Sequence, residues 1–246
     1  MLTGLQIRTL STCVKTLRKV SPNDLKSKIK GVSSQHWLSR QLSDPYVEKA
    51  KRMNYRCRSA FKLVEIDDRF KILHPGHVVV DCGASPGSWT QVAVKRVNSD
   101  GANQTLAKGT VCSIDKQHIY PIEGAVIFGN MDFTAPESQK SLTDFLNDEK
   151  VHAVLSDMAP NATGIRELDN ENMLKLCYAV LRFAVQVSRK EASVLVKMWQ
   201  CGSTKKLEAD MARFYDNVKV VKPNSSRMDS AEIFLLGRNF KGLKDS

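Results

Sequence analysis

The stretch that decides the fold of this chain reads Val78-Val79-Val80-Asp81-Cys82-Gly83-Ala84-Ser85-Pro86-Gly87-Ser88-Trp89-Thr90. It begins with β-branched residues, and such a run predicts a strand that is buried on both faces of a parallel sheet. An acid closes the run and a turn containing glycine follows, which is typical of a strand that leads into a ligand-binding loop. Two interpretations stay open here: the segment only packs, or it holds a cofactor related to a nucleotide.

Strand and helix patterns alternate along the rest of the chain. We expect strands at Val78–Asp81, Thr110–Ile114, Ala125–Phe128, Ala153–Ser156, Ser193–Met198, Val218–Val221 and Ile233–Leu236. We expect helices after Asp44-Pro45 and at Ser59–Phe70, Ser88–Val97, Ser138–Asn147, Asn170–Val187 and Lys205–Tyr215. This alternation predicts an α/β fold with a doubly wound, mostly parallel sheet of seven strands and helices on both faces. Only the loop Lys222–Asp229 separates the last two strands, so we expect a hairpin and one antiparallel strand in the edge region.

Charge is distributed very unevenly. The 246 residues carry a net charge of +11, but residues 1–40 hold eight basic side chains and one acid, whereas the rest hold 29 and 25. An acid-poor leader rich in Ser, Thr, Lys and Arg predicts a mitochondrial presequence over residues 1–36, and hence a matrix location. The alternative is a basic tail that touches RNA. Residues 37–240 are then expected to form the one folded domain.

Composition excludes several other classes of protein. With 42% hydrophobic and 26% charged residues the chain resembles an ordinary globular protein. Because no apolar run approaches the roughly 20 residues of a membrane helix, we expect no integral membrane segment. The six cysteines form no C-x-x-C pair and the five histidines are isolated. This pattern suits a reducing compartment and predicts neither a disulfide framework nor a metal site.

The glycine pattern of the loop narrows the choice of cofactor. A dinucleotide-binding turn needs G-x-G-x-x-G, in which the second glycine lets the backbone approach the pyrophosphate. Here Ser85 takes that second position, and no G-x-x-x-x-G-K-[ST] occurs in the chain. The turn therefore favours a cofactor with an amino-acid or nucleoside part and no phosphates.

Four acids end successive predicted strands: Asp81, Asp115, Asp132 and Asp157. In a doubly wound sheet the ligand lies across the carboxyl ends of the strands. A carboxylate after the second strand is well placed for ribose hydroxyls, and one after the third for an adenine amino group. Any one strand-end acid is more often a cap or a turn former, but four in register favour a cofactor site.

Three further segments carry a resemblance to a known family. They are Gly83-Ala84-Ser85-Pro86-Gly87-Ser88-Trp89, Ser156-Asp157-Met158-Ala159-Pro160-Asn161 and Tyr55-Arg56-Cys57-Arg58-Ser59-Ala60-Phe61-Lys62-Leu63. The chain from about Trp37 to Leu236 resembles the FtsJ/RlmE family of RNA ribose 2′-O-methyltransferases. The resemblance implies a Rossmann-like class I methyltransferase fold and S-adenosyl-L-methionine as the cofactor. The cofactor-binding residues would be Asp81, Gly83, Ala84, Pro86, Gly87, Ser88, Trp89, Asp115, Asp132 and Asp157. For Trp89 the alternative is a core residue.

The resemblance also implies a catalytic set of two lysines and two acids, Lys62, Asp157, Lys197 and Glu232. We expect Lys197 to accept the proton of the 2′-hydroxyl or to stabilise the developing alkoxide, and Asp157 to orient it. Lys62 and Glu232 would orient and balance charge. Taken one at a time, Lys62 and Glu232 are better explained as surface ion-pair partners, and only their membership of the set with Asp157 favours the catalytic role.

With the leader, the resemblance implies a mitochondrial member that methylates a uridine in the large-subunit rRNA. The expected partners are that rRNA and the assembling large ribosomal subunit, and we expect a monomer. RNA contact is assigned to Arg56, Arg58, Lys205, Lys206 and Arg227, with a solvated helix face as the alternative for charge alone. The rival functions are a tRNA or mRNA-cap 2′-O-methyltransferase, a non-catalytic ribosome-assembly factor and an NAD-dependent dehydrogenase.

Overall fold

The central strand of the sheet is β1 (Val78–Cys82), and all five of its residues are buried. In the computed structural model, which describes residues 44–243, β1 pairs in parallel with β2 on one side and β4 on the other. The β-branched run therefore forms the doubly covered strand that its composition predicts. The predicted presequence, residues 1–36, lies outside the described residues.

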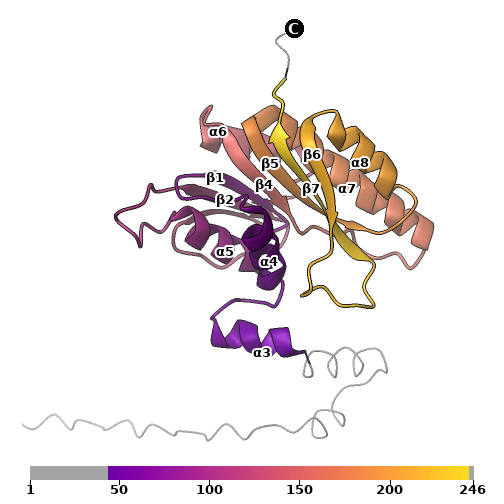
Figure 1. Cartoon of the computed structure of the whole chain (residues 1–246), viewed down its shortest axis with the longest axis horizontal. Helices are drawn as coiled ribbons and strands as arrows, with labels where there is room; N and C mark the ends of the chain where they lie inside the picture. Colours follow the sequence, from indigo (N-terminus) through magenta and orange to yellow (C-terminus); the bar gives the residue numbers. More distant parts are fainter. Residues whose placement is uncertain (1–43, 244–246) are drawn as a thin grey trace, which may run out of the picture. The chain divides into compact units, whose positions relative to one another are not determined.

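Seven strands form one sheet in the order β3-β2-β1-β4-β5-β7-β6. Their bounds are β2 Thr110–Asp115, β3 Ala125–Gly129, β4 Val151–Ser156, β5 Ser188–Trp199, β6 Tyr215–Val221 and β7 Glu232–Phe240. The helices are α3 Pro45–Arg52, α4 Ala60–Phe70, α5 Ser88–Val97, α6 Pro136–Leu146, α7 Arg166–Val187 and α8 Thr204–Ala212. Strands β1 to β5 are parallel, and β7 runs antiparallel to both β5 and β6 (Figure 1). The class I methyltransferase fold is thus confirmed.

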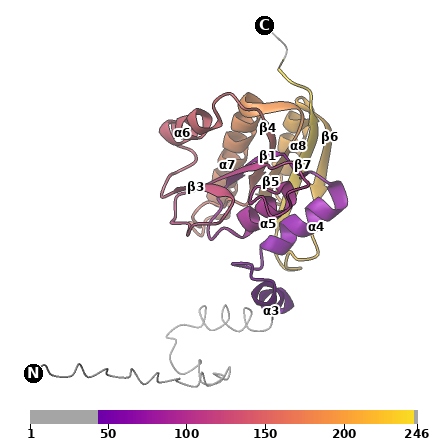
Figure 2. The ribbon, with the colours of Figure 1, turned by 90° about the vertical axis from the view of Figure 1, so that its left-hand side faces the viewer.

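Helices cover both faces of the sheet. One apolar core joins α4 and α5 to alternate strand residues such as Val79 and Phe234, whereas the other joins α6, α7 and α8 to the intervening ones such as Val80 and Leu235. Successive side chains of a strand point to opposite faces, so a fully apolar strand serves both cores. Figure 2 shows α4 and α5 on the opposite side of the sheet from α7 and α8.

The strand order reverses beside β1, because the chain first builds outward through β2 and β3 and then returns to β4 on the other side. At such a reversal the connections leave the sheet in opposite directions and open a crevice at the carboxyl ends of the strands. The loops that follow β1, β2 and β4 all lie at this edge. The fold therefore places the four strand-end acids around one crevice.

Several element boundaries differ from the sequence prediction: for example, α7 begins at Arg166 instead of Asn170, and β7 extends to Phe240 instead of Leu236. The last helix ends at Ala212, and Tyr215 begins β6 as a fully buried residue that pairs with Phe240. Strand β5 begins at Ser188, five residues earlier than expected, since a register shift lets it pair with Val151 of β4. The predicted hairpin exists, but its antiparallel strand β7 lies inside the sheet and β6 forms the edge.

No helix within residues 44–243 is long and apolar enough to cross a membrane. In the same range, no group of three or more His, Cys, Asp or Glu side chains could hold a metal ion.

Candidate active site

The loop after β1 turns sharply at Gly83. Its N–H and that of Ala84 both donate to the carbonyl oxygen of Ile114, at 2.8 and 3.1 Å. Gly83 has φ +77°, and a Cβ there would lie 2.2 Å from Cγ of Met158. Gly87 has φ +109°, and a Cβ there would lie 2.6 Å from Cδ1 of Ile122 and 2.8 Å from Nη1 of Arg56. Both positions therefore require glycine, for backbone conformation and for space.

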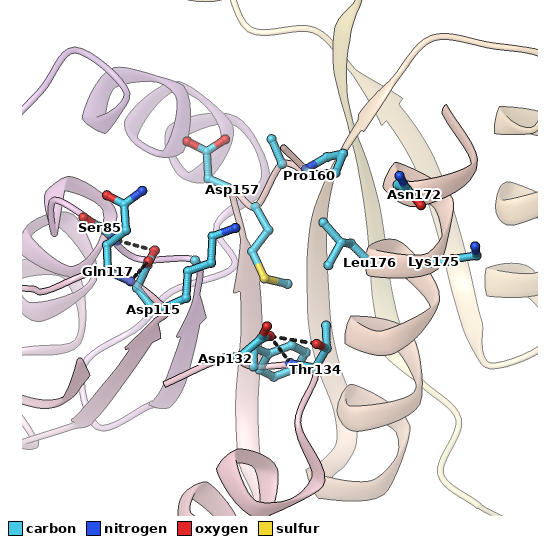
Figure 3. Close-up of a pocket in the computed structure, with 15 residues that line it drawn as sticks. Ser85, Asp115, Gln117, Asp132, Thr134, Asp157, Pro160, Asn172, Lys175 and Leu176 are labelled. Atoms are coloured by element: carbon cyan, nitrogen blue, oxygen red, sulfur yellow. Dashed lines mark hydrogen bonds between the residues drawn. The ribbon is translucent and has the colours of Figure 1, made fainter. Parts of the chain in front are cut away.

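A pocket of about 410 Å³ opens beside this loop at the carboxyl edge of the sheet (Figure 3). Its volume lies within the range of small-molecule sites. Four predicted cofactor residues line it: Gly83, Asp115, Asp132 and Asp157. The remaining lining residues are Ser85, Lys116, Gln117, Phe133, Thr134, Met158, Ala159, Pro160, Asn172, Lys175 and Leu176.

Two carboxylates in the pocket are held by nearby backbone. Asp115 accepts from the N–H of Ser85 at 2.9 Å and from the N–H of Gln117 at 2.7 Å. Asp132 accepts from the N–H and the hydroxyl of Thr134 through one oxygen, and these bonds lower the pKa of Asp132 (Figure 3). Each carboxylate keeps lone pairs for a ligand. Such acceptors fit the ribose hydroxyls and the adenine amino group of S-adenosyl-L-methionine.

Asp81 is fully buried at the end of β1. Its Oδ2 accepts from the hydroxyl of Thr90 at 2.7 Å, while its Oδ1 has no hydrogen-bond partner in the described structure. Burial raises the pKa of Asp81 to about 7, and the nearby Asp157 and Asp115 add to this shift. A buried carboxylate oxygen without a donor fits a cofactor that carries an ammonium group. The residues of the site thus match the cofactor that the resemblance implies.

The rest of the loop forms the back of the site. Ala84 and Ser88 are buried, and the Ser88 hydroxyl lies 3.0 Å from Sγ of Cys57. Trp89 is 2% exposed and packs against Phe234. Its Nε1 donates to the carbonyl of Ser59 at 2.9 Å. Trp89 therefore occupies a core position, which is the alternative to a wall of the pocket. Cofactor contact by Ala84, Pro86, Gly87, Ser88 and Trp89 stays a prediction.

The four predicted catalytic side chains meet in three dimensions. Nζ of Lys62 lies 2.7 Å from Oε2 of Glu232 and 4.0 Å from Oδ1 of Asp157. Nζ of Lys197 lies 3.1 Å from the same Oδ1 and also donates to the backbone carbonyl of Asp157. All four side chains are between 11% and 18% exposed. They come from α4, the end of β4, β5 and the start of β7 and form one compact set of two positive and two negative charges, called the tetrad below.

Two serines complete the tetrad. The hydroxyl of Ser59 donates to Oδ2 of Asp157 at 2.5 Å, and that of Ser226 donates to Oε1 of Glu232 at 2.9 Å. Sequence reasoning missed both, although Ser59 belongs to the segment that carried the family resemblance. It also missed Met158, Lys116 and Gln117, which line the pocket directly after strand-end acids. The position after a strand-end acid is the signal that could have found these three.

The predicted RNA-binding arginines Arg56 and Arg58 make intramolecular contacts. Arg56 donates to the carbonyl oxygens of Pro86, Tyr120 and Pro121, each at 2.8 Å. It thereby connects the loop after β1, called the cofactor loop below, to the segment after β2. Arg58 donates to the carbonyl of Ser225 in the loop between β6 and β7. These contacts give both arginines a positioning role, and RNA contact by them stays a prediction.

The other predicted RNA-binding residues lie in α8 and in the loop between β6 and β7. Lys205 and Lys206 are exposed in the first turn of α8, and Arg227 is half-buried in the β6–β7 loop. The structure contains no RNA, so their role also stays a prediction.

Comparison with known proteins identifies the family and several relatives of this chain. Residues 55–240 match the family model described as FtsJ-like methyltransferase. The chain is 59% identical over 228 residues to "rRNA methyltransferase 2, mitochondrial" of Drosophila melanogaster, covering 93% of this chain and 90% of that one. It is 39% identical over 223 residues to "Ribosomal RNA large subunit methyltransferase E" of Roseobacter denitrificans, covering 89% and 92%.

A solved structure agrees with the fold. A crystal structure of a ribosomal RNA methyltransferase from Plasmodium falciparum superposes with a TM-score of 0.67 at 27% identity, covering 77% of this chain and all of the other.

Proposed function

Because the chain belongs to the FtsJ-like methyltransferase family, which uses S-adenosyl-L-methionine, we propose that it methylates the ribose 2′-hydroxyl of a uridine in mitochondrial large-subunit rRNA. One observation carries the proposal: Asp157 both lines the cofactor pocket and contacts the two tetrad lysines. The tetrad side chains that would act on a hydroxyl therefore lie next to the pocket that would hold the methyl donor. The names of the relatives in Drosophila and Roseobacter support rRNA as the substrate.

The bound cofactor supplies a methyl group on a positively charged sulfonium. In this chain Gly83 lets the backbone approach the cofactor closely. Asp115 binds the ribose hydroxyls, Asp132 accepts from the adenine amino group, and Asp81 accepts from the ammonium group. Asp157 marks the end of the pocket at which the methyl group must be presented.

Lys197 acts on the attacking oxygen. An ammonium group has three donors. One of those on Lys197 is bonded to the carbonyl of Asp157, and the ion pair with Oδ1 holds the ammonium group beside that carboxylate. Another of its donors is available for the 2′-oxygen of the substrate, where it stabilises the negative charge that develops as the hydroxyl proton passes to solvent water. Donors arranged in advance around a developing charge lower the barrier because they need no reorganisation during the reaction.

Lys62 and Glu232 hold the second half of the tetrad. Their ion pair is 2.7 Å long, and the hydroxyl of Ser226 fixes the other oxygen of Glu232. Because Lys62 also faces Oδ1 of Asp157, it balances the charge of that carboxylate and keeps it oriented toward Lys197. The arrangement places the two reactants side by side, which is itself a large part of enzymatic rate enhancement.

We further propose that the protein works in the mitochondrial matrix as a monomer on the assembling large ribosomal subunit. The mitochondrial name of the Drosophila relative and the basic leader support this location. We expect the target nucleotide to be unpaired, because sequence-specific RNA recognition mostly uses single-stranded loops, bulges and ends.

The decisive experiment is a map of 2′-O-methyl sites in mitochondrial rRNA from cells with and without the protein. We expect one uridine of the large-subunit rRNA to lose its methyl group and to regain it on re-expression of the wild-type chain. Re-expression of Lys197→Ala should not restore it. An unchanged rRNA map would refute the substrate, and a change confined to tRNA or to mRNA caps would support the rival assignments.

A further inference from the structure

A second hollow lies at the same edge of the sheet as the cofactor pocket. It has a volume of about 280 Å³ and is lined by Gly164, Arg166, Asp169, Asn170, Trp199, Gln200 and Ala231. None of these residues lines the cofactor pocket. They come from the loop after β4, the start of α7, the end of β5 and the start of β7, so the hollow lies among the elements that carry Asp157, Lys197 and Glu232.

The register of β5 and β7 relates this hollow to the tetrad. Trp199 is the partner of Glu232 across the two strands, and the N–H of Gln200 donates to the carbonyl of Ala231 at 2.7 Å. Trp199 lies two residues beyond Lys197, which corresponds to about 7 Å along a strand. Ala231 is bonded directly to Glu232. Trp199 and Ala231, which line the hollow, therefore each lie within about one side-chain length of a tetrad residue.

The side chains of the hollow suit a nucleobase. Trp199 is half-buried: it packs against the core that contains α7 and also lines the hollow. Within residues 44–243 the indole N–H of Trp199 and the side-chain amides of Asn170 and Gln200 have no hydrogen-bond partner. These groups are left as donors and acceptors for a base edge. Arg166 is exposed and carries a positive charge beside them. An aromatic platform with nearby polar groups is how proteins bind unpaired RNA bases.

Local hydrogen bonds fix the loop that borders the hollow. Gly164 has φ +84°, and a Cβ placed on it would meet no atom within 4 Å. Asp169 accepts from the hydroxyl and N–H of Thr163 at 2.7 Å each, and thereby fixes this loop at the start of α7. These bonds lower the pKa of Asp169, so its carboxylate stays negatively charged, and Arg166 is the positively charged residue of the hollow.

We propose that this hollow receives the unpaired base of the methylated nucleotide, stacked on Trp199, with Asn170 and Gln200 facing its edge. The proposal rests on the proposed function, because it assigns the base of the ribose on which the tetrad acts. The base is attached to the carbon next to the one that carries the 2′-hydroxyl. With that hydroxyl at Lys197, the base is directed to an adjacent site, and the hollow is such a site.

The test combines a protein change with a change in the RNA. Wild type, Trp199→Ala and Trp199→Phe are assayed with an RNA fragment around the target and with the same fragment lacking the base at the target ribose. For Trp199→Ala we expect KM for the intact fragment to rise about tenfold or more, as stacking of one base implies. Trp199→Phe should recover much of this loss, and affinity for S-adenosyl-L-methionine should stay unchanged in both variants.

The abasic fragment separates base stacking from a merely structural role. If Trp199 holds the target base, wild type loses affinity for the abasic fragment, and Trp199→Ala loses little more, since the two changes remove the same contact. Equal KM increases for Trp199→Ala on both fragments would overturn the proposal, and so would a parallel loss of cofactor affinity. Phe145→Ala removes another partly exposed aromatic, on α6, and is the matched control.

Two further outcomes keep the test decisive. Failure of the wild-type protein to methylate the intact fragment would refute the proposed function and not the hollow alone. If Trp199→Ala does not fold, Gln200→Ala and Asn170→Ala provide the second measurement, because neither removes core packing. A KM for intact RNA that is unchanged in both would overturn the proposal.

Discussion

The two halves of the carboxyl edge hold their carboxylates in different ways. On the cofactor side, Asp115 and Asp132 accept from backbone N–H groups two residues further along the chain. On the tetrad side, Asp157 and Glu232 meet lysines that lie 40 to 170 residues away in the sequence. One half is organised mainly by local turns, with one further bond from the N–H of Ser85 to Asp115, and the other by the packing of four separate elements.

This difference determines how each half responds to change. The cofactor-side carboxylates keep open oxygens, so altering that side should mainly weaken binding of the cofactor. The tetrad is a closed set of partly buried charges in which each lysine faces a carboxylate. Removing one member of such a set leaves an uncompensated charge and is strongly unfavourable. The comparison therefore predicts separate losses: chemistry on one side, affinity on the other.

The largest expected effect is that of Lys197→Ala. Loss of a donor to the developing charge should lower kcat by about 10²–10³-fold, while calorimetry should find the affinity for S-adenosyl-L-methionine close to that of wild type. Lys140→Ala is the matched control, because it removes an exposed lysine from an ion pair with Asp144 on α6. A Lys197→Ala protein with wild-type kcat would contradict the role of the tetrad.

Gly83→Ala should break the cofactor side alone. The new Cβ would clash with Met158 and hold an L-residue at φ +77°, which together should lower the free energy of unfolding by about 2–5 kcal/mol. Thermal unfolding and cofactor titration are the measurements, and both should show a loss. Gly202→Ala is the control, since its Cβ would meet no atom within 4 Å. Unchanged cofactor affinity in Gly83→Ala would show that the loop does not form the site.

Arg56→Lys should have a smaller effect on the same side. Lysine cannot reproduce the planar set of three hydrogen bonds to Pro86, Tyr120 and Pro121. Loss of one or two net hydrogen bonds should raise the dissociation constant of S-adenosyl-L-methionine by about tenfold, with kcat at saturating cofactor retained. Arg213→Lys, at the end of α8, is the control. If RNA affinity fell instead and cofactor affinity did not, Arg56 would be an RNA contact as first predicted.

The last expected effect is a slope of stability with pH, which is small over any one pH unit. Asp81 has a pKa raised from 3.8 to about 7 by burial, so the folded state takes up a proton between these values. Its stabilising contribution is complete below pH 4 and is lost as the pH rises to about 7, by at most about 1.4 kcal/mol per pH unit. Asp81→Asn lacks this titration.

Chemical denaturation of both proteins between pH 4 and 8 measures the effect of Asp81. The difference in the free energy of unfolding, wild type minus Asp81→Asn, should fall across this window and level off above pH 7. Using the difference cancels the contribution of His77, whose pKa is lowered to about 4 by burial and by the nearby His152 and His74. A flat difference would mean that Asp81 is ionised throughout.

Most elements of the fold could be predicted, and the errors share one cause. The helix Ser88–Val97 was predicted to the residue, because a glycine turn precedes it and Asn98 ends it in a left-handed conformation. The segment around Tyr215 was assigned to a helix, although it pairs with Phe240 in β6. Pairing with a distant strand overrides local preference, and no local pattern reports it.

The candidate site divides in the same way. Strand-end acids and a glycine turn are local patterns, so Gly83, Asp115 and Asp132 could be assigned to the cofactor side without coordinates. Trp89 could not be placed, because a tryptophan after a loop suits either a pocket wall or a core. Its 2% exposure and its contact with Phe234 depend on how α5 packs on β7.

The sequence by itself determined the alternation of strands and helices, the kind of cofactor its turn can accept and the family to which the chain belongs. These follow from side-chain periodicity and from backbone constraints that act over a few residues. Only the tertiary structure decided that Lys62, Asp157, Lys197 and Glu232 share one site and that Arg56 clamps the cofactor loop. It also decided that a second hollow opens beside Trp199. Such convergence arises because the carboxyl ends of strands far apart in the chain are brought to one edge of the sheet, a geometry that sequence spacing does not encode.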